Sequence, residues 1–419
     1  MPFPTILSPF TTILLVCYLY THNSAMKIIT RTVWILSLVS LFTDIASEML
    51  YPVMPLFLKD IGYSAVFIGV LEGVAEAIAG ISKSYFGKRS DAMGKRLPFV
   101  QLGYGFSAIS KPLLAFFAYP LWIFFCRTLD RLGKGIRTGA RDAMLSDEST
   151  AATRGRVFGF HRAMDTLGAV MGPAIALVYL YYHPRAYTTL FVIAFAPGLL
   201  ALLSTLLIKE KKKPVTEKKE ITQPRLFAFF SYWKNSPVAY RKLVMGLLLF
   251  ALFNSSDVFL LLKMKESGLN DVSSIGIYIF YNLVYGLCSY PLGMMADKAG
   301  LKRIFLLGLV LFAMVYAGFA FNNSMFIFVL MFAVYGVYAA ATEGISKAWI
   351  SNLVPKNETA SAIGTYSGLQ SICSLIASSL AGIIWYKFGA TAMFISSSII
   401  TLIAVGYLGD IKFSNREAA

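Results

Sequence analysis

Long apolar runs separated by short polar loops dominate the chain after residue 26. A membrane-spanning helix needs roughly 20 mostly apolar residues, and only helices or closed barrels satisfy their backbone hydrogen bonds inside a bilayer. The runs are far longer than the roughly ten-residue alternating segments of a barrel. The pattern therefore predicts an all-α polytopic membrane protein with twelve spans, at about 31–58, 64–86, 97–117, 119–142, 157–182, 187–208, 239–263, 272–295, 302–321, 324–350, 358–386 and 390–410.

One connection, residues 209–238, is much longer than the others, and it is polar, basic and interrupted by proline. It predicts a cytoplasmic linker between two six-helix bundles, residues 26–208 and 239–410, with a cytoplasmic tail at 411–419. Lys and Arg gather in the loops on the linker's side of the membrane, as the positive-inside rule requires. We expect a multi-pass protein of the bacterial inner membrane with both termini of the twelve-helix unit in the cytoplasm.

Residues 1–25 fit this pattern poorly. The stretch "ILSPFTTILLVCYLY" is short for a span, and it lacks the basic segment that precedes the core of a signal peptide. Directly after it, "MKIITRTVWIL" has the character of an ordinary cytoplasmic start. We expect Met26 to be the native initiator and residues 1–25 to be dispensable. As a thirteenth span, the segment would place the N-terminus outside.

Composition supports the membrane assignment and narrows the function. The 419 residues are 57% hydrophobic and 14% charged, with a mean hydropathy of +0.64, whereas soluble domains average about 25% charged residues. The net charge of +16 comes mostly from loop cations, so nucleic acid is not an expected partner. The four cysteines show neither disulfide pairing nor metal-ligand spacing. Without a Ser/His/Asp set, a P-loop or a zinc spacing, no enzyme, cofactor or metal is expected.

Two loops at equivalent positions of the halves carry the same pattern. After the second span, "GKRSDAMGKR" places Gly87, Asp91 and Arg96, and after the eighth span, "GMMADKAGLKR" places Gly293 and Asp297. Glycine permits a tight turn, and an aspartate can face the positive end of a nearby helix. The recurrence predicts an internal repeat, which is how many secondary transporters are built.

With these loops the chain resembles the major facilitator superfamily, over essentially its whole length from Met26. The loops are similar to the signature G-x-x-x-D-x-x-G-[RK]-[RK] of that family. The resemblance implies that Asp91 docks on the N-terminus of the eleventh span, which opens with "NETAS", and so closes the cytoplasmic side. Gly87, Arg96 and Asp297 are assigned to the same gating function.

Other stretches refine the resemblance. In the fifth span, "GAVMGPAIAL" is similar to the family's antiporter motif G-x-x-x-G-P-x-x-G-G, but Ala176 and Leu177 replace its last two glycines. That departure weakens an inference of export. The stretches "FTDIASEMLYPVMP", "DRLGKGIRTGARDAML" and "ATEGISKAWISNLVP" resemble a bacterial subgroup of mostly unassigned substrate, some of whose members are linked to iron chelates.

The fourth span is unusually charged for a membrane helix. A charge at the bilayer centre costs roughly 2.5–3.5 kcal/mol, so such side chains should face a cavity or a partner. We interpret Arg127 and Arg131 as substrate-binding residues and Asp130 as a proton-coupling group, while Arg137 and Arg141 belong to the cytoplasmic gate. The family's usual motif here is R-x-x-Q-G. Asp130 and Arg131 replace its glutamine and glycine, and the more cationic helix indicates an anionic cargo.

Acidic residues in the first span are candidates for proton coupling. Asp44 and Glu48 are spaced i, i+4, so they share one helical face close to mid-membrane. They are either proton carriers or ion-pair partners of the arginines in the fourth span. In the tenth span, Glu343 and Lys347 have the same spacing and are expected to pair with each other.

The C-terminal half is less charged and more aromatic. In the seventh span, "FNSSDVF" places Asn254, a candidate substrate-binding residue, and Asp257, a candidate proton-coupling group. In the eighth span, "IYIFYNLVYG" places Tyr281 and Tyr285 on one face, where they can either bind a flat ligand or pack against a neighbouring helix. We assign both tyrosines to the substrate site.

Together these features predict a secondary transporter that moves a small anionic solute, an organic anion or a ferric chelate, by proton-coupled alternating access. Its expected partners are the solute, protons and the lipid bilayer, and we expect a monomer. A proton-driven multidrug or metabolite efflux antiporter is the alternative, although such a protein should show isolated acidic groups in an apolar cavity and few cations. A receptor or scaffold would have no need of charges at mid-depth.

Overall fold

The computed structural model describes residues 28–51, 53–63, 65–210, 228–269 and 271–411, and the regular structure of these residues is helical. Residues 1–25, whose dispensability is predicted above, lie outside the described part. The N-terminal half contains α2 (Arg31–Leu50), α3 (Val53–Asp60), α4 (Ala65–Met93), α5 (Leu97–Leu113), α6 (Pro120–Asp147), α7 (Arg154–Tyr182) and α8 (Tyr187–Thr205). The rest contains α9 (Ala228–Asn235), α10 (Val238–Ala251), α11 (Val258–Glu266), α12 (Asp271–Ala299), α13 (Leu301–Phe321), α14 (Met325–Asn352), the short 3₁₀ helix η2 (Lys356–Glu358) and α15 (Thr359–Asp410).

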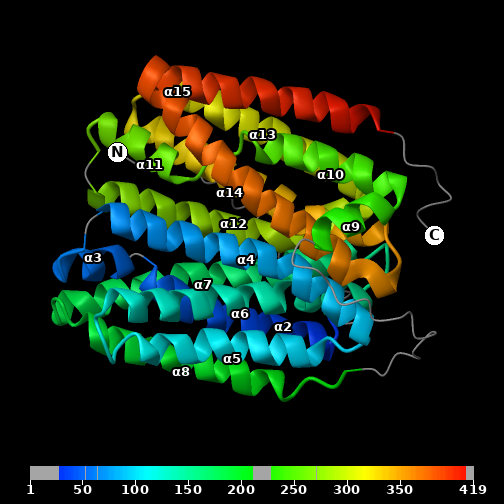
Figure 1. Ribbon diagram of the computed structural model, residues 1–419. Coiled ribbons are helices and arrows are strands. Elements are labelled where there is room, and N and C mark those ends of the chain that lie inside the picture. The colour runs from blue at the N-terminus through cyan, green and yellow to red at the C-terminus, as the bar shows by residue number, and fades with distance from the viewer. Residues whose placement is uncertain (1–27, 52, 64, 211–227, 270, 412–419) are drawn as a thin grey trace, which may run out of the picture.

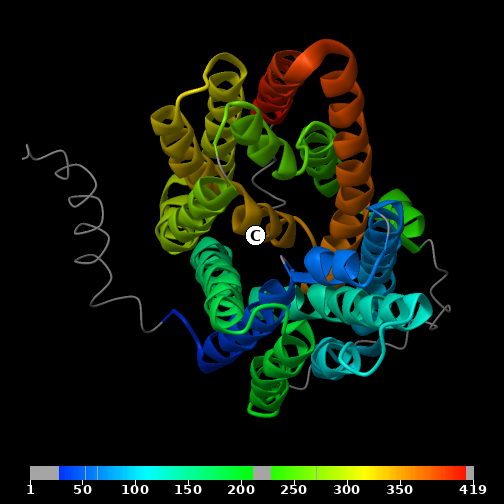
Figure 2. The same ribbon diagram turned by 90° about the vertical axis from the view of Figure 1, so that its left-hand side faces the viewer.

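The helices form two bundles that lie side by side with their axes roughly parallel. Figure 1 shows α2–α8 in the lower half of the view and α10–α15 in the upper half, and Figure 2 looks along the helices of both. The bundles meet along two helix pairs, α4 with α15 and α7 with α12. The family's two-bundle architecture that the sequence predicts is therefore confirmed.

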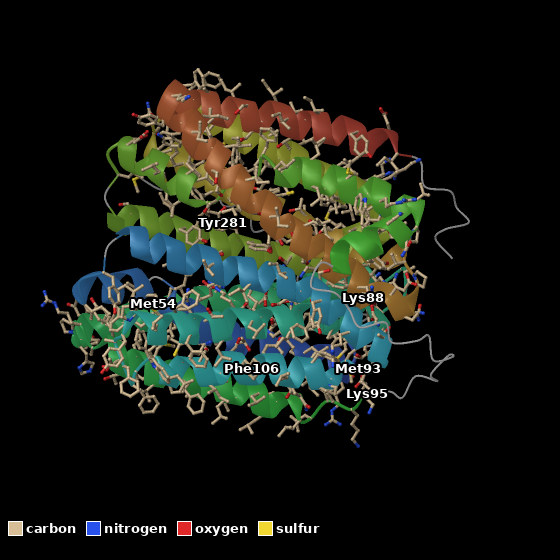
Figure 3. All side chains as sticks on the ribbon, in the orientation of Figure 1. Met54, Lys88, Met93, Lys95, Phe106 and Tyr281 are labelled. Atoms are coloured by element: carbon tan, nitrogen blue, oxygen red, sulfur yellow. The ribbon has the colours of Figure 1, made fainter. Side chains whose placement is uncertain are left out.

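The two ends of the molecule carry different loops. We call the end with the two repeated loops, Gly87–Arg96 and Gly293–Arg303, the motif end, and the opposite end the far end. Figure 3 labels Lys88, Met93 and Lys95 at the motif end and Met54 at the far end, with Tyr281 between them.

Two predicted spans contain breaks, and one continuous helix is divided where two spans were expected. The first span divides into α2, which ends at Leu50, and α3, which begins at Val53. The seventh predicted span, 239–263, consists of two helices: α10 ends at Ala251 and α11 begins at Val258. The chain between them contains Asn254, Ser255 and Ser256, whose side chains compete with the helical backbone for hydrogen bonds. In α15, Gly389 has φ 85° and separates the eleventh span from the twelfth.

Six described segments are long and apolar enough, by length and composition, to cross a bilayer. They are Arg31–Leu50, Arg154–Tyr182, Tyr187–Thr205, Leu301–Phe321, Met325–Asn352 and Lys356–Asp410. The charged α6 is not among them. Its Arg127, Arg137 and Arg141 are nevertheless buried, so they are shielded from lipid by neighbouring helices.

The predicted linker, residues 209–238, contains a short helix. This helix, α9, lies against α4 and α15, and the hydroxyl of its Tyr232 donates a hydrogen bond to Glu358 over 3.5 Å. The start of the C-terminal half is thereby attached to the interface between the halves.

Candidate functional site

The aspartate of the first repeated loop holds the N-terminus of a helix in the other half. An Oδ2 atom of Asp91, at the end of α4, accepts a hydrogen bond from the backbone N–H of Ser361 over 2.7 Å. Ser361 is in the first turn of α15, where backbone N–H groups have no partner within the helix. The positive end of the helix dipole also favours a carboxylate there. This is the contact that the family resemblance implied.

The second repeated loop makes the equivalent contact in the opposite direction. Asp297, at the end of α12, accepts hydrogen bonds from the backbone N–H groups of Gly155 over 2.7 Å and Arg156 over 3.0 Å. Both donors lie in the first turn of α7. Arg156 adds an ion pair at 3.1 Å. Each half therefore holds one helix N-terminus of the other half.

Both aspartates are buried at the motif end, beyond the predicted spans. Burial raises the pKa of Asp91 to about 6, although the Arg96 guanidinium and the Ser361 N–H group act in the opposite direction. Burial likewise raises the pKa of Asp297 to about 6 against the effect of the Arg156 and Gly155 N–H groups. Because burial outweighs these contacts, both carboxyl groups take up a proton in mild acid.

Arg96 connects the first contact to its surroundings. Its guanidinium pairs with Asp91 at 3.3 Å and with Asp147, and it donates a hydrogen bond to the backbone oxygen of Lys356 over 2.7 Å. Asp147 belongs to α6 and Lys356 to the other half, so one side chain ties together three segments. Arg96 thus lies where a gating residue is expected.

Glycines let the halves approach at both contacts. A Cβ atom at Gly87 would lie 2.5 Å from the backbone oxygen of Ala360, and one at Gly155 would lie 2.5 Å from the backbone oxygen of Gly293. Real Cβ atoms do not approach so closely, so only glycine fits without a backbone shift. Gly87 and Gly293 begin the two repeated motifs, but they lie within α4 and α12 and allow a close approach of helices, while the positive φ angles occur at Gly94 and Gly300.

Two ion pairs from α14 reach across to the N-terminal half. Lys347 Nζ lies 2.7 Å from an Oδ2 atom of Asp142 on α6, and Glu343 pairs with Arg162 on α7 at 3.3 Å. Glu343 and Lys347 were expected to pair with each other. Instead each has a partner in the other half, because their shared face points into the interface rather than to a neighbour within the bundle.

A polar chain continues from these pairs into the N-terminal half. Arg141 pairs with Asp142 at 2.9 Å and donates a hydrogen bond to Ser40 on α2 over 3.3 Å. The Ser40 hydroxyl donates to Asp165 on α7, which also pairs with Arg162 at 2.7 Å. Arg141, predicted to be a gating residue, is therefore part of the chain of contacts that joins the halves.

Four cations surround Asp130 on α6. Lys111 of α5 pairs with it at 3.1 Å, and Arg127, Arg131 and Arg137 all lie close enough to interact electrostatically with its carboxylate. The Lys111, Arg127 and Arg137 side chains are buried, with 3%, 6% and 5% exposure of the residues. We call these five residues the basic cluster. It is a buried region of positive potential inside the N-terminal half.

The basic cluster contains one residue that was assigned elsewhere. Arg137 was predicted to belong to the cytoplasmic gate, but its guanidinium donates a hydrogen bond to Ser107 over 2.6 Å and lies 4.4 Å from the centre of the Tyr104 ring. Both partners are on α5, within the same half. Arg137 therefore faces the interior of its own bundle.

Lys134 lies on another face of α6, and it is exposed. It is 14 residues below Pro120, the first residue of the helix, and hence about 21 Å from the far end at 1.5 Å per residue. Glu48 on α2 interacts electrostatically with both Lys134 and Arg131. Because a lysine against lipid is costly, the exposure of Lys134 at this depth indicates a polar space rather than a lipid-facing surface.

The C-terminal half supplies an aromatic region. Tyr281 is buried among Tyr278, Tyr285, Tyr335 and Phe332, with ring centroids 5.1–6.1 Å from its own. The candidate Asp257, beside the break in the seventh span, accepts a hydrogen bond from Tyr335 over 2.7 Å.

The nearby Asn254 donates to the hydroxyl of Tyr338 over 3.2 Å. The structure thus gathers Asn254, Asp257 and Tyr281 in one region of the C-terminal half. Tyr285 is buried on the same face of α12, next to Thr166 of α7.

The sequence analysis did not identify Lys111, Arg162 or Asp165 as residues of the site. Lys111 is a single lysine before Pro112 in an otherwise apolar span, and a charge in that position was an available signal. Arg162 and Asp165 are spaced i, i+3, which indicates a local pair and gives no sign of a contact with Glu343.

Among the described residues, no group of three or more His, Cys, Asp or Glu side chains could hold a metal ion.

Two helical bundles with reciprocal contacts at one end and buried charges between them are the features of a membrane transporter. A model of the Major Facilitator Superfamily matches residues 36–280 and 268–416. The chain belongs to this superfamily, and it is a secondary transporter and not an enzyme.

Relatives and solved structures agree with this assignment. An uncharacterised MFS-type transporter of Methanocaldococcus jannaschii is 32% identical over 389 residues, which are 91% of this chain and 95% of that protein. The quinolone resistance protein NorA of Staphylococcus aureus is 24% identical over 187 residues, 44% of this chain and 47% of NorA.

The E. coli fucose:proton symporter FucP has the same fold, with a TM-score of 0.74 at 10% identity over 91% of this chain and 98% of FucP. The human organic anion transporter MFSD10 has a TM-score of 0.72 at 16% identity over 90% and 99% of the two chains.

Proposed function

We propose that this transporter moves a small anionic solute across the inner membrane by proton-coupled alternating access, as a monomer whose motif end, linker and termini face the cytoplasm. The observation that carries the proposal is the basic cluster, in which Asp130 has four cationic neighbours. Positive charge concentrated in a membrane protein favours binding of an anion, because the low-dielectric surroundings screen the attraction little. An organic anion and a ferric chelate of citrate type both fit this requirement.

The closed motif end supports the direction of access. The hydrogen bonds of Asp91 and Asp297 and the ion pairs of α14 join the halves there. Lys134, in contrast, is exposed deep below the far end. In this conformation the solute would enter from the far end and pass the level of Arg127 and Arg131 before it reaches Lys134, the deepest of the three.

The aromatic region of the C-terminal half is the proposed opposite wall of the substrate site. Tyr281 and Tyr285 offer flat surfaces, and Asn254 offers an amide whose hydrogen bond to Tyr338 a ligand could replace. Aromatic side chains bind ligand faces through packing and hydroxyl contacts. These residues would select the shape of the solute, whereas the basic cluster selects its charge.

Proton coupling is assigned to the carboxyl groups of Asp44 and Glu48, with Asp257 in the C-terminal half. Asp130 is a weaker candidate than the sequence indicated, because a carboxylate surrounded by four cations is held in its charged form. We assign Asp130 instead to positioning Lys111 and its neighbours.

The experiment that tests the proposal is uptake into vesicles that contain the purified protein. Citrate, ferric citrate and the lipophilic cation tetraphenylphosphonium are offered with and without an imposed pH gradient. We expect uptake of an anionic probe that depends on the gradient and is lost in Arg127→Gln but kept in Lys95→Met, which removes an exposed cation at the motif end. Gradient-independent uptake by the wild type would exclude proton coupling.

Efflux of a drug or metabolite is the second candidate. The specific observation in its favour is the similarity to NorA, which is a quinolone resistance protein, over 187 residues. Transport of tetraphenylphosphonium alone, unaffected by Arg127→Gln, would favour efflux over anion transport.

A further inference from the structure

The guanidinium of Arg162 on α7 holds one carboxylate from each half, at two different distances. Its Nη1 atom lies 2.7 Å from the Oδ2 atom of Asp165 on the same helix, and its Nη2 atom lies 3.3 Å from the Oε2 atom of Glu343 on α14. Charge-assisted hydrogen bonds between nitrogen and oxygen are usually about 2.7–2.9 Å long. Asp165 is therefore the close partner, and it is itself fixed by a hydrogen bond from the Ser40 hydroxyl. Glu343 is the loosely held partner.

The Glu343 carboxylate is also far more exposed than other carboxylates that pair across the halves. Its side chain is 40% exposed, whereas the side chains of Asp142 and Asp297 are 0% and 1% exposed. Because charged groups against lipid are costly, the exposed side of the Arg162–Glu343 pair indicates a polar space. Glu343 is thus within reach of a solute, and the two buried carboxylates are not.

This ion pair lies deeper than Lys134 for a solute that enters from the far end. On α7, Arg162 is eight residues, or about 12 Å, from the start of the helix at the motif end. On α14, Glu343 is nine residues, or about 14 Å, from the end of the helix there. On α6, Lys134 is 13 residues, or about 20 Å, from the motif end of its helix. The pair therefore lies between the depth of Lys134 and the contacts that close the motif end.

The hydroxyl of Tyr285 on α12 is close to the same level. The two helices pack there, since a Cβ atom at Gly286 would lie 3.6 Å from the backbone oxygen of Ala163, the residue after Arg162. Tyr285 is buried, and its hydroxyl makes no hydrogen bond within the described part of the chain. The hydroxyl of the neighbouring Thr166 donates instead to the backbone oxygen of Arg162 over 2.9 Å. An unpaired buried hydroxyl is costly, so a ligand that reaches Arg162 gains a second polar contact here.

Glu343 presents to Arg162 the same chemical group that an organic anion would present. The planar fork of a guanidinium matches a carboxylate in geometry as well as in charge. Asp165 holds the other edge of the fork, so Arg162 keeps its orientation when the Glu343 carboxylate leaves. A displaced Glu343 has a second cation nearby, because Lys347 lies one helical turn away on the same face of α14.

We propose that Arg162 binds an anionic group of the cargo, and that Glu343 takes this position when no cargo is bound. The proposal rests on the anion transport proposed above and adds to it a binding residue on α7, outside the basic cluster. An arriving anion displaces the Glu343 carboxylate from the Nη2 atom, which breaks one of the ion pairs between α14 and the N-terminal half. Binding of the cargo thereby weakens the closure of the motif end.

Charge-selective labelling tests this position without any cargo. A single cysteine is introduced as Glu343→Cys in the purified full-length protein, whose four native cysteines are replaced by serine. The anionic reagent sulfonatoethyl methanethiosulfonate is compared with the cationic reagent trimethylammonioethyl methanethiosulfonate, each relative to its rate with free cysteine. Because Arg162 then faces the thiol, the anionic reagent should react at least about tenfold faster than the cationic one.

Two controls separate Arg162 from the other cations of the N-terminal half. Glu343→Cys combined with Arg162→Gln and Asp165→Asn removes the cation together with its buried partner, so that no unpaired carboxylate remains, and the preference should disappear. Ala118→Cys, in the exposed loop between α5 and α6 at the far end, should show no preference.

A preference that survives the loss of Arg162 would overturn the proposal, and so would failure of both reagents to label Glu343→Cys. Equal rates of the two reagents in Glu343→Cys would overturn it as well, which keeps the test decisive if the triple variant does not fold.

Glu343→Gln tests the displacement, with citrate as the anionic probe in calorimetry. If Glu343 competes for Arg162, its removal should lower the Kd of citrate by up to about fivefold, which is the strength of an exposed ion pair. Glu266→Gln removes a carboxylate that bonds to Trp385 within the C-terminal half, and it should leave the Kd unchanged. A citrate affinity that is not raised in Glu343→Gln would overturn the competition. The labelling readout needs no transported solute, so its failure is distinct from a failure of citrate uptake in vesicles.

Discussion

The Oδ2 atom of Asp142 on α6 lies 2.7 Å from the Nζ atom of Lys347 on α14, so a buried ion pair joins the two halves near the motif end. Asp142 is fully buried, and its other oxygen is occupied by Arg141 at 2.9 Å. The carboxylate thus depends on one cation from each half. Any conformation that separates α6 from α14 removes Lys347 from Asp142 and has to replace this cation.

Removal of the Lys347 charge should weaken closure of the motif end. Lys347→Met deprives Asp142 of a charged hydrogen-bond partner, which is worth about 1.5–3 kcal/mol, so the ratio of closed to open molecules should fall about ten- to a hundredfold. A cysteine reporter at Ser84, which is 1% exposed and faces Gly364 of α15, should then be labelled faster by a water-soluble maleimide.

The matched control for this prediction is Lys302→Met. Lys302 donates hydrogen bonds to the backbone oxygens of Gly409 and Ile411, within its own half. Reporter labelling should be unchanged in this variant. Equal labelling rates in Lys347→Met and the wild type would mean that the ion pair does not hold the halves together.

The contact between Asp91 and α15 should depend on an acceptor oxygen and not on charge. Asp91→Ala removes the acceptor of the Ser361 N–H group, and loss of such a helix cap costs about 0.5–2 kcal/mol. Labelling of the Ser84 reporter should therefore rise by up to about thirtyfold. Asp91→Asn keeps a carbonyl oxygen in place without the charge that burial disfavours, so it should label no faster than the wild type. If both variants label equally fast, the negative charge is the essential feature.

Closure of the motif end should be favoured by mild acid. Burial raises the pKa of Asp91 and of Asp297 to about 6 in the closed conformation, whereas an aspartate in water titrates near about 3.9. A carboxyl group with the higher pKa in the closed state stabilises that state fully below about pH 4, and the effect is lost as the pH rises through 6. Between pH 7.5 and 5, each group should therefore favour closure by up to about tenfold.

Labelling of the Ser84 reporter should accordingly slow down as the pH falls over this range, after correction for the reactivity of the free thiol. The double variant Asp91→Asn/Asp297→Asn should lose this dependence. Faster labelling in mild acid would contradict the prediction, since it would mean that protonation opens the motif end.

Lys111 should be required for binding of an anion, although it was not recognised in the sequence. Lys111→Met removes a buried cation of the basic cluster. An anion at a hundred times its Kd adds about 2.7 kcal/mol to the stability of the wild type, which is visible as a thermal shift. We expect this shift to disappear in Lys111→Met and to remain in Lys95→Met. A normal shift in Lys111→Met would move the anion site away from the basic cluster.

The sequence predicted the bundles from local signals, and the family resemblance that the repeated loops carry implied the contact of Asp91 with the eleventh span. Apolar length defines spans, and the repeated loops carry aspartates at fixed offsets from their glycines. The break in the seventh span gave a weaker signal, since Asn254 and its serine neighbours are tolerated in a continuous helix as well. Only the tertiary structure determines whether the helix continues through these residues or breaks there.

The partners of charged side chains were harder to predict, for a geometric reason. Glu343 and Lys347 satisfy the spacing of a local pair, and sequence alone does not say what faces them. Arg137 and Arg141 are also one turn apart, yet Arg137 contacts α5 and Arg141 contacts α2. Because α6 passes different neighbours along its length, two residues on one of its faces can have unrelated partners.

The glycines at the contact between the two halves constrain the sequence differently from the charged residues around them. An ion pair can drift during evolution, because a change in one partner can be compensated by a change in the other. Gly87 faces the backbone oxygen of Ala360, and Gly155 faces that of Gly293. Main-chain atoms are the same in every amino acid, so no second substitution can make room there. In a library of random variants, these positions should tolerate nothing larger than hydrogen and should reveal the line along which the halves touch.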